Sequence, residues 1–230
     1  MNKNKMGHEK KEGIMNFFDC VLDFLFPPVC GICLKRNGKS ICDECRKIIN
    51  YKSINKIEKY KKKYFYKHLY IFKYEGIIRQ RLLEYKFKEK AYLYKTFAET
   101  IIHDKDNIEY IKKYDILIPV PIHKKRKKDR GYNQSELIAK EIAKFCKDIK
   151  LELNILYKKG NIVAQSTLDK KERMKNIKNV FEIRNECKIK NKKILLLDDI
   201  YTTGSTVNEC SRILKNAGCK EIGIITIAKD

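Results

Sequence analysis

The stretch KILLLDDIYTTGST at residues 193–206 constrains the fold of this chain more than any other part of the sequence. Its run of consecutive apolar residues, 194–197, predicts a strand that is buried on both faces, as in a parallel sheet covered by helices. Two acidic residues and a run of hydroxyl residues around one glycine follow directly. Because ligands bind beyond the carboxyl ends of the strands in an open parallel sheet, this stretch predicts a ligand site at that edge.

The residues after the strand have the chemistry of a sugar-phosphate site. Asp198 and Asp199 offer carboxylates that can accept hydrogen bonds from neighbouring ribose hydroxyls or help hold a divalent ion. A glycine lets the backbone approach an anion closely, and successive N–H groups and the next helix N-terminus supply positive potential. The predicted phosphate loop consists of Thr202, Thr203, Gly204, Ser205 and Thr206. The alternative is a polar turn that only caps a helix; a Walker loop is excluded because its GxxxxGKS or GxxxxGKT pattern is missing.

Strand and helix patterns alternate around this stretch. Apolar runs predict strands at 68–73, 115–120, 180–183, 193–197 and 221–228, and helical spacing predicts helices at 76–87, 91–102, 133–146 and 205–216. Asn133, with Glu136 three residues later, has the pattern of a capping box at the start of its helix. This alternation with nearly continuous apolar strands predicts the α/β class, a parallel sheet flanked by helices.

Four of the nine cysteines form two CxxC pairs. Cys30 and Cys33 are followed by Cys42 and Cys45, and two such turns can aim four thiolates at one point to complete a tetrahedral zinc site. Four thiolates leave no open coordination position, so this zinc would be structural. The alternative is a pair of disulfides or redox-active dithiols. The other five cysteines are scattered through apolar patterns, which predicts that they fill the core.

The stretch Ile14–Phe26 could be confused with the core of a signal peptide. Its polar residues Asn16, Asp19 and Asp23 fall on one helical stripe, which favours an amphipathic helix packed on the protein. No apolar run approaches the ~18 residues of a transmembrane helix, so we expect a cytoplasmic location. The expected organisation is a disordered tail at 1–13, the amphipathic helix and a zinc ribbon at 14–50, a basic connector at 51–75 and the α/β domain at 76–230.

Basic residues outnumber acidic residues by 52 to 29, which gives a formal net charge of +23. Such a surplus attracts phosphate-rich partners such as nucleic acid or an anionic membrane. The segment Tyr60–Tyr66, YKKKYFY, interleaves aromatic rings that could stack on bases with lysines that could meet phosphates. Two alternatives stay open: AT-rich codons also favour lysine and tyrosine, and the aromatic run could be a buried edge strand. The charge permits DNA binding without demonstrating it.

The phosphate loop closely resembles the phosphoribosyl pyrophosphate (PRPP) loop of type I phosphoribosyltransferases. On this resemblance, Asp198 and Asp199 meet the ribose hydroxyls, residues 202–206 hold the 5-phosphate, and Mg²⁺ accompanies PRPP. Further segments resemble the ComF family of competence-associated proteins: LFPPVCGIC at 25–33, YEGIIRQRLLEYKF at 74–87, RGYNQ at 130–134 and QSTLDKKERMKNIKNV at 165–180. This second resemblance covers residues 14–230, nearly the whole chain.

The ComF resemblance implies a zinc ribbon joined to a phosphoribosyltransferase-like domain, here at 76–230, and a role in DNA uptake by naturally competent bacteria. It implies PRPP or another ribose 5-phosphate as ligand, with single-stranded DNA and a competence helicase as partners. It also implies a cytoplasmic position peripheral to the membrane-associated uptake machinery. Only one four-cysteine site is visible, which departs from a double zinc ribbon.

The strand-end loop at 120–130 is where a pyrophosphate could dock. Its many cations either contact a ligand or DNA, or form a solvated basic loop. Arg130 is the preferred ligand residue because Gly131 lets the chain turn toward the site, and we group it with the acidic pair as the catalytic set. Asn133 and Gln134 either contact the ligand or cap the helix. The segment Gln165–Asn176 is either a mobile lid or a plain surface helix.

Two functions are consistent with these features. The first is a PRPP-binding protein of natural competence that acts with single-stranded DNA. The second is an active phosphoribosyltransferase of nucleotide metabolism or salvage, in which PRPP loses pyrophosphate through an oxocarbenium-like state. No sequence feature identifies an acceptor, so the sequence leaves catalysis open.

Overall fold

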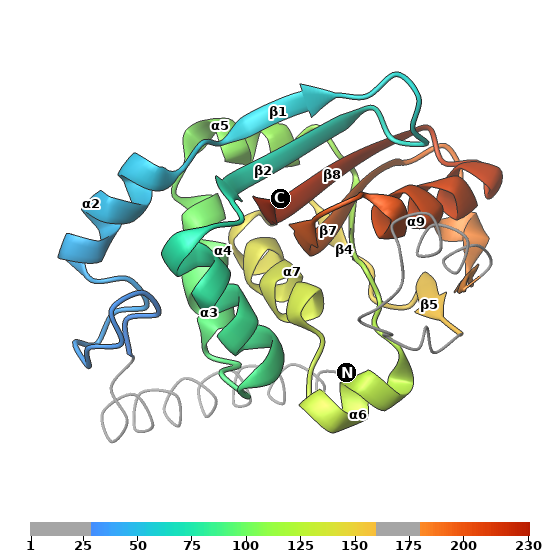
Figure 1. The fold of residues 1–230 in the computed structure, drawn as a ribbon. Coiled ribbons are helices and arrows are strands. Elements are labelled where there is room, and N and C mark those ends of the chain that lie inside the picture. Colours follow the sequence, from blue (N-terminus) through green and yellow to red (C-terminus); the bar gives the residue numbers. More distant parts are fainter. Residues whose placement is uncertain (1–28, 160–179) are drawn as a thin grey trace, which may run out of the picture.

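The computed structural model describes residues 29–159 and 180–230 and shows a twisted sheet with helices packed against it (Figure 1). Six strands form the sheet in the order β1-β2-β8-β7-β3-β4. The strands are β1 (Lys56–Lys59), β2 (Lys67–Lys73), β3 (Ile116–Pro119), β4 (Lys150–Leu151), β7 (Lys193–Tyr201) and β8 (Glu221–Lys229). Only β1 pairs antiparallel, with β2; all other neighbours are parallel. The predicted α/β class with a parallel sheet is confirmed.

The sheet is covered on both faces because successive residues of its central strands point in opposite directions. Leu195 and Leu197 of β7 join a buried cluster with one set of helices: α3 (Gly76–Phe87), α4 (Leu93–Ile102), α5 (Lys105–Ile111) and α7 (Gln134–Phe145). Ile194 and Leu196 join a second cluster with α9 (Ser205–Asn216) and the strand pair β5 (Leu156–Lys158) and β6 (Phe181–Ile183). This two-sided burial explains the continuous apolar run of β7.

The N-terminal described segment holds a turn that carries Cys30 and Cys33, followed by α2 (Asp43–Lys52), which has Cys42 as its N-cap and Cys45 in its first turn. A bridge between Val29 and Arg36 closes the turn that carries Cys30 and Cys33. The segment packs beside α3 and α4, on the same side of the sheet (Figure 1). The predicted tail at 1–13, the predicted helix at 14–26 and the segment at 165–176 lie outside the described residues. Within the described ranges, no helix is long and apolar enough to cross a membrane.

Three local expectations differ from the structure. In the stretch 51–75, expected to be a basic connector, β2 confirms the predicted strand at 68–73, but β1 was not predicted and adds a further strand to the main sheet. The expected basic loop contains a short helix, α6 (Lys124–Arg130), which ends at Gly131 in the left-handed region. Cys187 is exposed in a 3-10 turn at Glu186–Lys188, whereas Cys146, Cys210 and Cys219 are buried as predicted.

Candidate functional site

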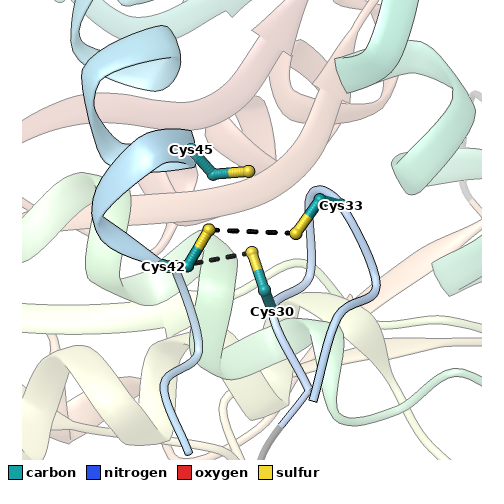
Figure 2. A group of neighbouring side chains, drawn as sticks. All are labelled: Cys30, Cys33, Cys42 and Cys45. Atoms are coloured by element: carbon teal, nitrogen blue, oxygen red, sulfur yellow. Dashed lines mark hydrogen bonds between the residues drawn. The ribbon is translucent and has the colours of Figure 1, made fainter. Parts of the chain in front are cut away.

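The four cysteines predicted to bind zinc converge on one point (Figure 2). Their Sγ atoms all lie within 4.8 Å of one another, and Cys33 Sγ is 3.8 Å from Cys42 Sγ. Zinc–sulfur bonds of about 2.3 Å in a tetrahedron place sulfurs about 3.8 Å apart, so this donor set fits tetrahedral zinc. All cysteines in the described ranges are free thiols, which disagrees with the disulfide alternative.

Backbone N–H groups prepare one of these thiols for a metal. Burial acts to raise the pKa of Cys30, but N–H donors from Cys33, Cys42 and Ile32 outweigh it and lower the pKa to about 7. One of these donors, the N–H of Cys42, lies 3.4 Å from Cys30 Sγ. In contrast, burial and the neighbouring thiols raise the pKa of Cys45. The cluster therefore offers one thiolate readily, and a cation would favour deprotonation of the others.

The cysteine module is joined tightly to α3 and α4. Gly31 lies so close to α4 that any side chain at this position would overlap Thr96. Arg81 of α3 is buried and donates from Nε and Nη2 to the carbonyl oxygen of Ile32, at 3.0 and 2.7 Å. Its Nη1 donates to Glu84 Oε2 at 2.7 Å. A buried arginine thus holds the first CxxC turn against α3.

A cavity of about 750 Å³ opens at the carboxyl ends of β3 and β7, where the parallel sheet predicts a ligand site. Among its lining residues are Lys86 and Phe87 of α3, Arg126 and Arg130 of α6, Gln134 and Ser135 of α7, Lys158 of β5, and Asp198, Asp199, Thr202 and Thr206 around the end of β7. The structure therefore brings the predicted acidic pair, Arg130 and part of the predicted phosphate loop into one cavity.

The acidic pair belongs to the last residues of β7, which continues to Tyr201 rather than ending before the pair. Asp199 forms an ion pair with Lys86 Nζ at 2.9 Å. Asp198 accepts hydrogen bonds from Ser135 Oγ at 3.3 Å and from the N–H of Asp199 at 3.0 Å. Burial, reinforced by the adjacent carboxylate, raises the pKa of Asp198 to about 7. Such a perturbed carboxyl in a cavity is typical of a functional site.

The predicted phosphate loop forms a tight turn between β7 and α9. Gly204 has a φ of +71°, a left-handed conformation that favours glycine, and any side chain there would overlap the ring of Tyr201. Thr203 Oγ1 and Ser205 Oγ are 2.7 Å apart, and the N–H of Ser205 donates to Thr203 Oγ1 at 3.3 Å. Thr202 and Thr206 line the cavity itself. Because α9 begins at Ser205, its unpaired N–H groups lie beside the cavity.

The RGYNQ run packs against the end of α3. Tyr132 stacks on Tyr85 of α3, with ring centres 5.6 Å apart, and its hydroxyl donates to the Tyr85 carbonyl at 2.6 Å. Arg130 donates to Gln134 Oε1, and its guanidinium carbon lies 5.6 Å from the centre of the Phe87 ring. Burial lowers the pKa of Arg130, while nearby Asp199 opposes this shift.

The two alternatives for Asn133 and Gln134, ligand contact and helix capping, do not exclude each other, because both residues line the cavity. Asn133 accepts from the Ser135 N–H and donates to the Val120 carbonyl, so it caps α7 and holds the end of β3. The capping box is only half formed, because Glu136 binds Lys127 and Lys140 instead of closing it. Gln134 donates to the Tyr85 carbonyl at 3.2 Å and also lines the cavity.

Several cavity residues were not singled out from the sequence, among them Lys86, Phe87, Ser135 and Lys158. Lys86 and Phe87 stand at the end of a helix that the sequence predicted correctly, but their direction depends on how α3 packs. Ser135 looks like an ordinary first-turn residue. Burial lowers the pKa of Lys158, with Arg126 adding to the effect. No local pattern distinguishes these residues from surface residues.

Comparisons with known proteins agree with this architecture. Residues 130–230 match the family model described as Phosphoribosyl transferase domain. Competence protein ComFC of Streptococcus pneumoniae is 32% identical over 162 residues, covering 70% of this chain and 68% of the relative. Competence protein F of Haemophilus influenzae is 31% identical over 151 residues, covering 63% of this chain and 65% of the relative. DNA utilization protein YhgH of Escherichia coli O6:H1 is 27% identical over 110 residues, covering 48% of this chain and 47% of the relative.

The parallel sheet, the β7–α9 loop and the matched domain define a protein of the phosphoribosyltransferase fold, with a four-cysteine module on its N-terminal side. The matches to the relatives span about half to two thirds of their lengths. The chain belongs to the ComF family.

Proposed function

We propose that this chain binds PRPP and acts in natural competence, with single-stranded DNA as its partner. The observation that carries the proposal is the cavity that joins the acidic pair to the phosphate loop and the basic residues of α3, α6 and β5. The names of the competence and DNA-utilization relatives support the biological setting. Within that setting we propose a cytoplasmic position beside the DNA-uptake machinery, near a competence helicase.

In the proposed complex the phosphate loop holds the 5-phosphate of PRPP. The N–H groups at the start of α9 and the hydroxyls of Thr202 and Thr206 donate to it. Asp198 and Asp199 accept from the ribose hydroxyls, and Arg130 contacts the pyrophosphate. Mg²⁺ bound with PRPP would neutralise pyrophosphate charge. Lys86 leaves Asp199 and turns to the phosphates, so an internal ion pair is exchanged for ligand contacts.

The proposed zinc has a structural role. Four sulfur donors complete its coordination without a place for substrate. Its binding free energy would stabilise the turns that Arg81 holds against α3.

The proposed DNA contact is the β1–β2 connection. Tyr64 and Tyr66 are each 47% exposed there, and Lys61 and Lys62 are exposed beside them. The N–H of Tyr64 donates to Asn208 in the first turn of α9, so the connection lies against the helix that starts at the phosphate loop. Exposed rings alternating with lysines suit bases and phosphates of a single strand. The burial expected of an edge strand applies to Phe65, which is 2% exposed, and in part to Tyr60, which packs against the same apolar cluster.

The alternative function is an active phosphoribosyltransferase of nucleotide metabolism or salvage. The observation that favours it is the raised pKa of Asp198, because perturbed carboxyls are concentrated at catalytic sites. Asp198, Asp199 and Arg130 would then stabilise the charge that develops as pyrophosphate leaves. Turnover of PRPP with a panel of bases and amines distinguishes catalysis from binding alone.

PRPP binding is tested by thermal unfolding with PRPP and Mg²⁺. The ligand should raise the melting temperature of the wild-type chain, and Asp198→Ala/Asp199→Ala should abolish the rise. Asp106→Ala/Asp148→Ala is a charge-matched control, because both residues are exposed and neither lines the cavity. An unchanged ligand response in the first double variant would contradict the proposed site.

DNA binding is tested by titration with oligo(dT) at several salt concentrations. Affinity should fall steeply with salt, and Tyr64→Ala/Tyr66→Ala should weaken it. Tyr51→Ala, which removes a ring that is 90% exposed on α2, is the control. Binding that is absent, or equal in both variants, would refute the proposed contact.

A further inference from the structure

An exposed aromatic ring stands at the mouth of the ligand cavity. Phe87 is the last residue of α3, is 71% exposed and is one of the lining residues. Leaving a phenyl ring in water forgoes the stabilisation that burial would bring, so a ligand that covers the ring gains that stabilisation. The ring lies outside residues 130–230, the part that matches the phosphoribosyltransferase model.

Arg130 holds one side of this ring. Its guanidinium carbon lies 5.6 Å from the ring centre, a cation–π distance, while the same side chain donates to Gln134. The arginine is itself partly buried, so its contact restricts the ring. With 71% of Phe87 still exposed, the remaining surface of the ring is free to receive a flat partner.

Cations and carboxylates share the cavity beside Phe87, and the carboxylates of Glu89, Asp129, Asp198 and Asp199 can accept from sugar hydroxyls. Lys86, Arg126, Arg130 and Lys158 line the same cavity and provide charge for phosphate groups. A ribose bearing only phosphates has no flat surface to place on the ring. A ligand that combines a planar heteroaromatic ring with phosphorylated sugar uses both the ring and the cations.

We infer that Phe87 and Arg130 form a stacking platform for a nucleobase at the rim of the cavity. The inference rests on the proposed sugar-phosphate site and names the chemical class that occupies its outer part. The base belongs either to a free acceptor that enters beside PRPP or to a nucleotide of a single strand. Both sources present the same planar surface to Phe87.

The absence of tryptophan from the chain allows a direct test. Phe87→Trp places a single indole on the platform, and a stacked base should quench its fluorescence. Tyr51→Trp is the matched control, because that exposed position lies on α2 and does not line the cavity. The probes are oligo(dT) alone and each common free nucleobase with PRPP and Mg²⁺.

Saturable quenching of Phe87→Trp but not of Tyr51→Trp is the expected result. Quenching by oligo(dT) identifies a base within a strand, and quenching by a free base with PRPP identifies an acceptor. Phe87→Ala should weaken, about tenfold, the binding of whichever probe quenches the fluorescence of Phe87→Trp. Phe87→Leu, which keeps apolar volume without an aromatic face, should lose most of the same affinity.

Two results would overturn the platform: no quenching of Phe87→Trp by any probe, or equal quenching of both tryptophan variants. The wild-type response to PRPP separates this failure from failure of the proposed function. If PRPP raises the melting temperature but bases do not stack on residue 87, only the platform is wrong. If PRPP has no effect on the wild-type chain, the sugar-phosphate site is wrong.

Discussion

Replacing Arg81 with methionine should destabilise the protein strongly, because this side chain is the main polar link between the cysteine module and α3. The Arg81 and Glu84 side chains are each only 7% exposed. Methionine keeps much of the apolar volume but leaves the Ile32 carbonyl without its two donors. Glu84 retains Lys90 at 3.0 Å, which limits the damage.

The magnitude follows from burial. Burial alone would raise the pKa of Glu84, but hydrogen bonds from Lys90 and Arg81 hold it below its ordinary value. Breaking a buried ion pair from one side costs about 3–5 kcal/mol, and an unsatisfied buried carbonyl costs about 1–3 kcal/mol. Because Lys90 remains, we expect Arg81→Met to lower the free energy of unfolding by about 3–5 kcal/mol in total. That is a large part of a typical stability of about 5–15 kcal/mol.

The assay is urea unfolding of the zinc-loaded protein followed by far-UV circular dichroism, with zinc content measured in parallel. Lys39→Met is the control, since its ion pair with Asp43 is exposed on both sides and its loss should leave the midpoint unchanged. Arg81→Met/Glu84→Met should recover part of the lost stability, because it removes the uncompensated carboxylate. If Arg81→Met unfolds at the same urea concentration as Lys39→Met, the link carries no stability and the reasoning is refuted.

Three further predictions concern the sheet and its ligand edge. Gly204→Ala should destabilise the protein by about 1–3 kcal/mol and remove the PRPP response, since it strains a left-handed residue and overlaps the Tyr201 ring; Gly38→Ala, also left-handed but in open space, should keep the response. Burial, aided by a nearby lysine, lowers the pKa of His68 to about 3. As the pH falls, the imidazole is therefore protonated in the unfolded chain before it is protonated in the folded chain, and stability should fall between about pH 6.5 and pH 3. At about pH 4.5 the loss of unfolding free energy amounts to about 2–3 kcal/mol, and the pH profile of stability of His68→Gln should be flatter by that amount. Equal profiles for the wild-type chain and His68→Gln would contradict the role given to His68. Because burial and the adjacent carboxylate raise the pKa of Asp198 to about 7, its ionised form opposes folding as pH rises from about 4 to 7. Asp198→Asn should therefore raise stability by about 1–2 kcal/mol near pH 8, discounted for partial exposure, while losing PRPP binding; a loss of stability at that pH would reverse the assignment.

The regular elements were predictable where a local pattern repeats. Helical spacing predicted 76–87 with the bounds that α3 has, and the apolar run predicted a strand at 193–197, which is the first half of β7. The strand continues to Tyr201 because β8 pairs with it that far, which no local pattern of β7 contains. The helix α6 was missed because a run of cations without apolar spacing has no helical period.

The candidate site likewise contains residues that a local pattern predicted and residues that only the packing of the chain brings there. The acidic pair and the phosphate loop were found because the chain itself carries them from a strand into a helix over a few residues. Arg130 was chosen for its neighbouring glycine, and the cavity contains it. Lys86 was not found, although it forms the ion pair with Asp199, because its role depends on where the end of α3 lies over the sheet.

What the sequence determined by itself is what a few consecutive residues can encode. Two CxxC turns specify a four-sulfur cluster, and a buried strand followed by acids, hydroxyls and a glycine specifies a ligand edge. Only the tertiary structure decided that one helix joins the two. Arg81 in the middle of α3 holds the cysteine module, and Lys86 and Phe87 at the end of α3 reach the cavity. The physical reason is that α3 packs against both the cysteine module and the ligand edge of the sheet. This packing depends on buried contacts between segments far apart in the sequence, which no local periodicity contains.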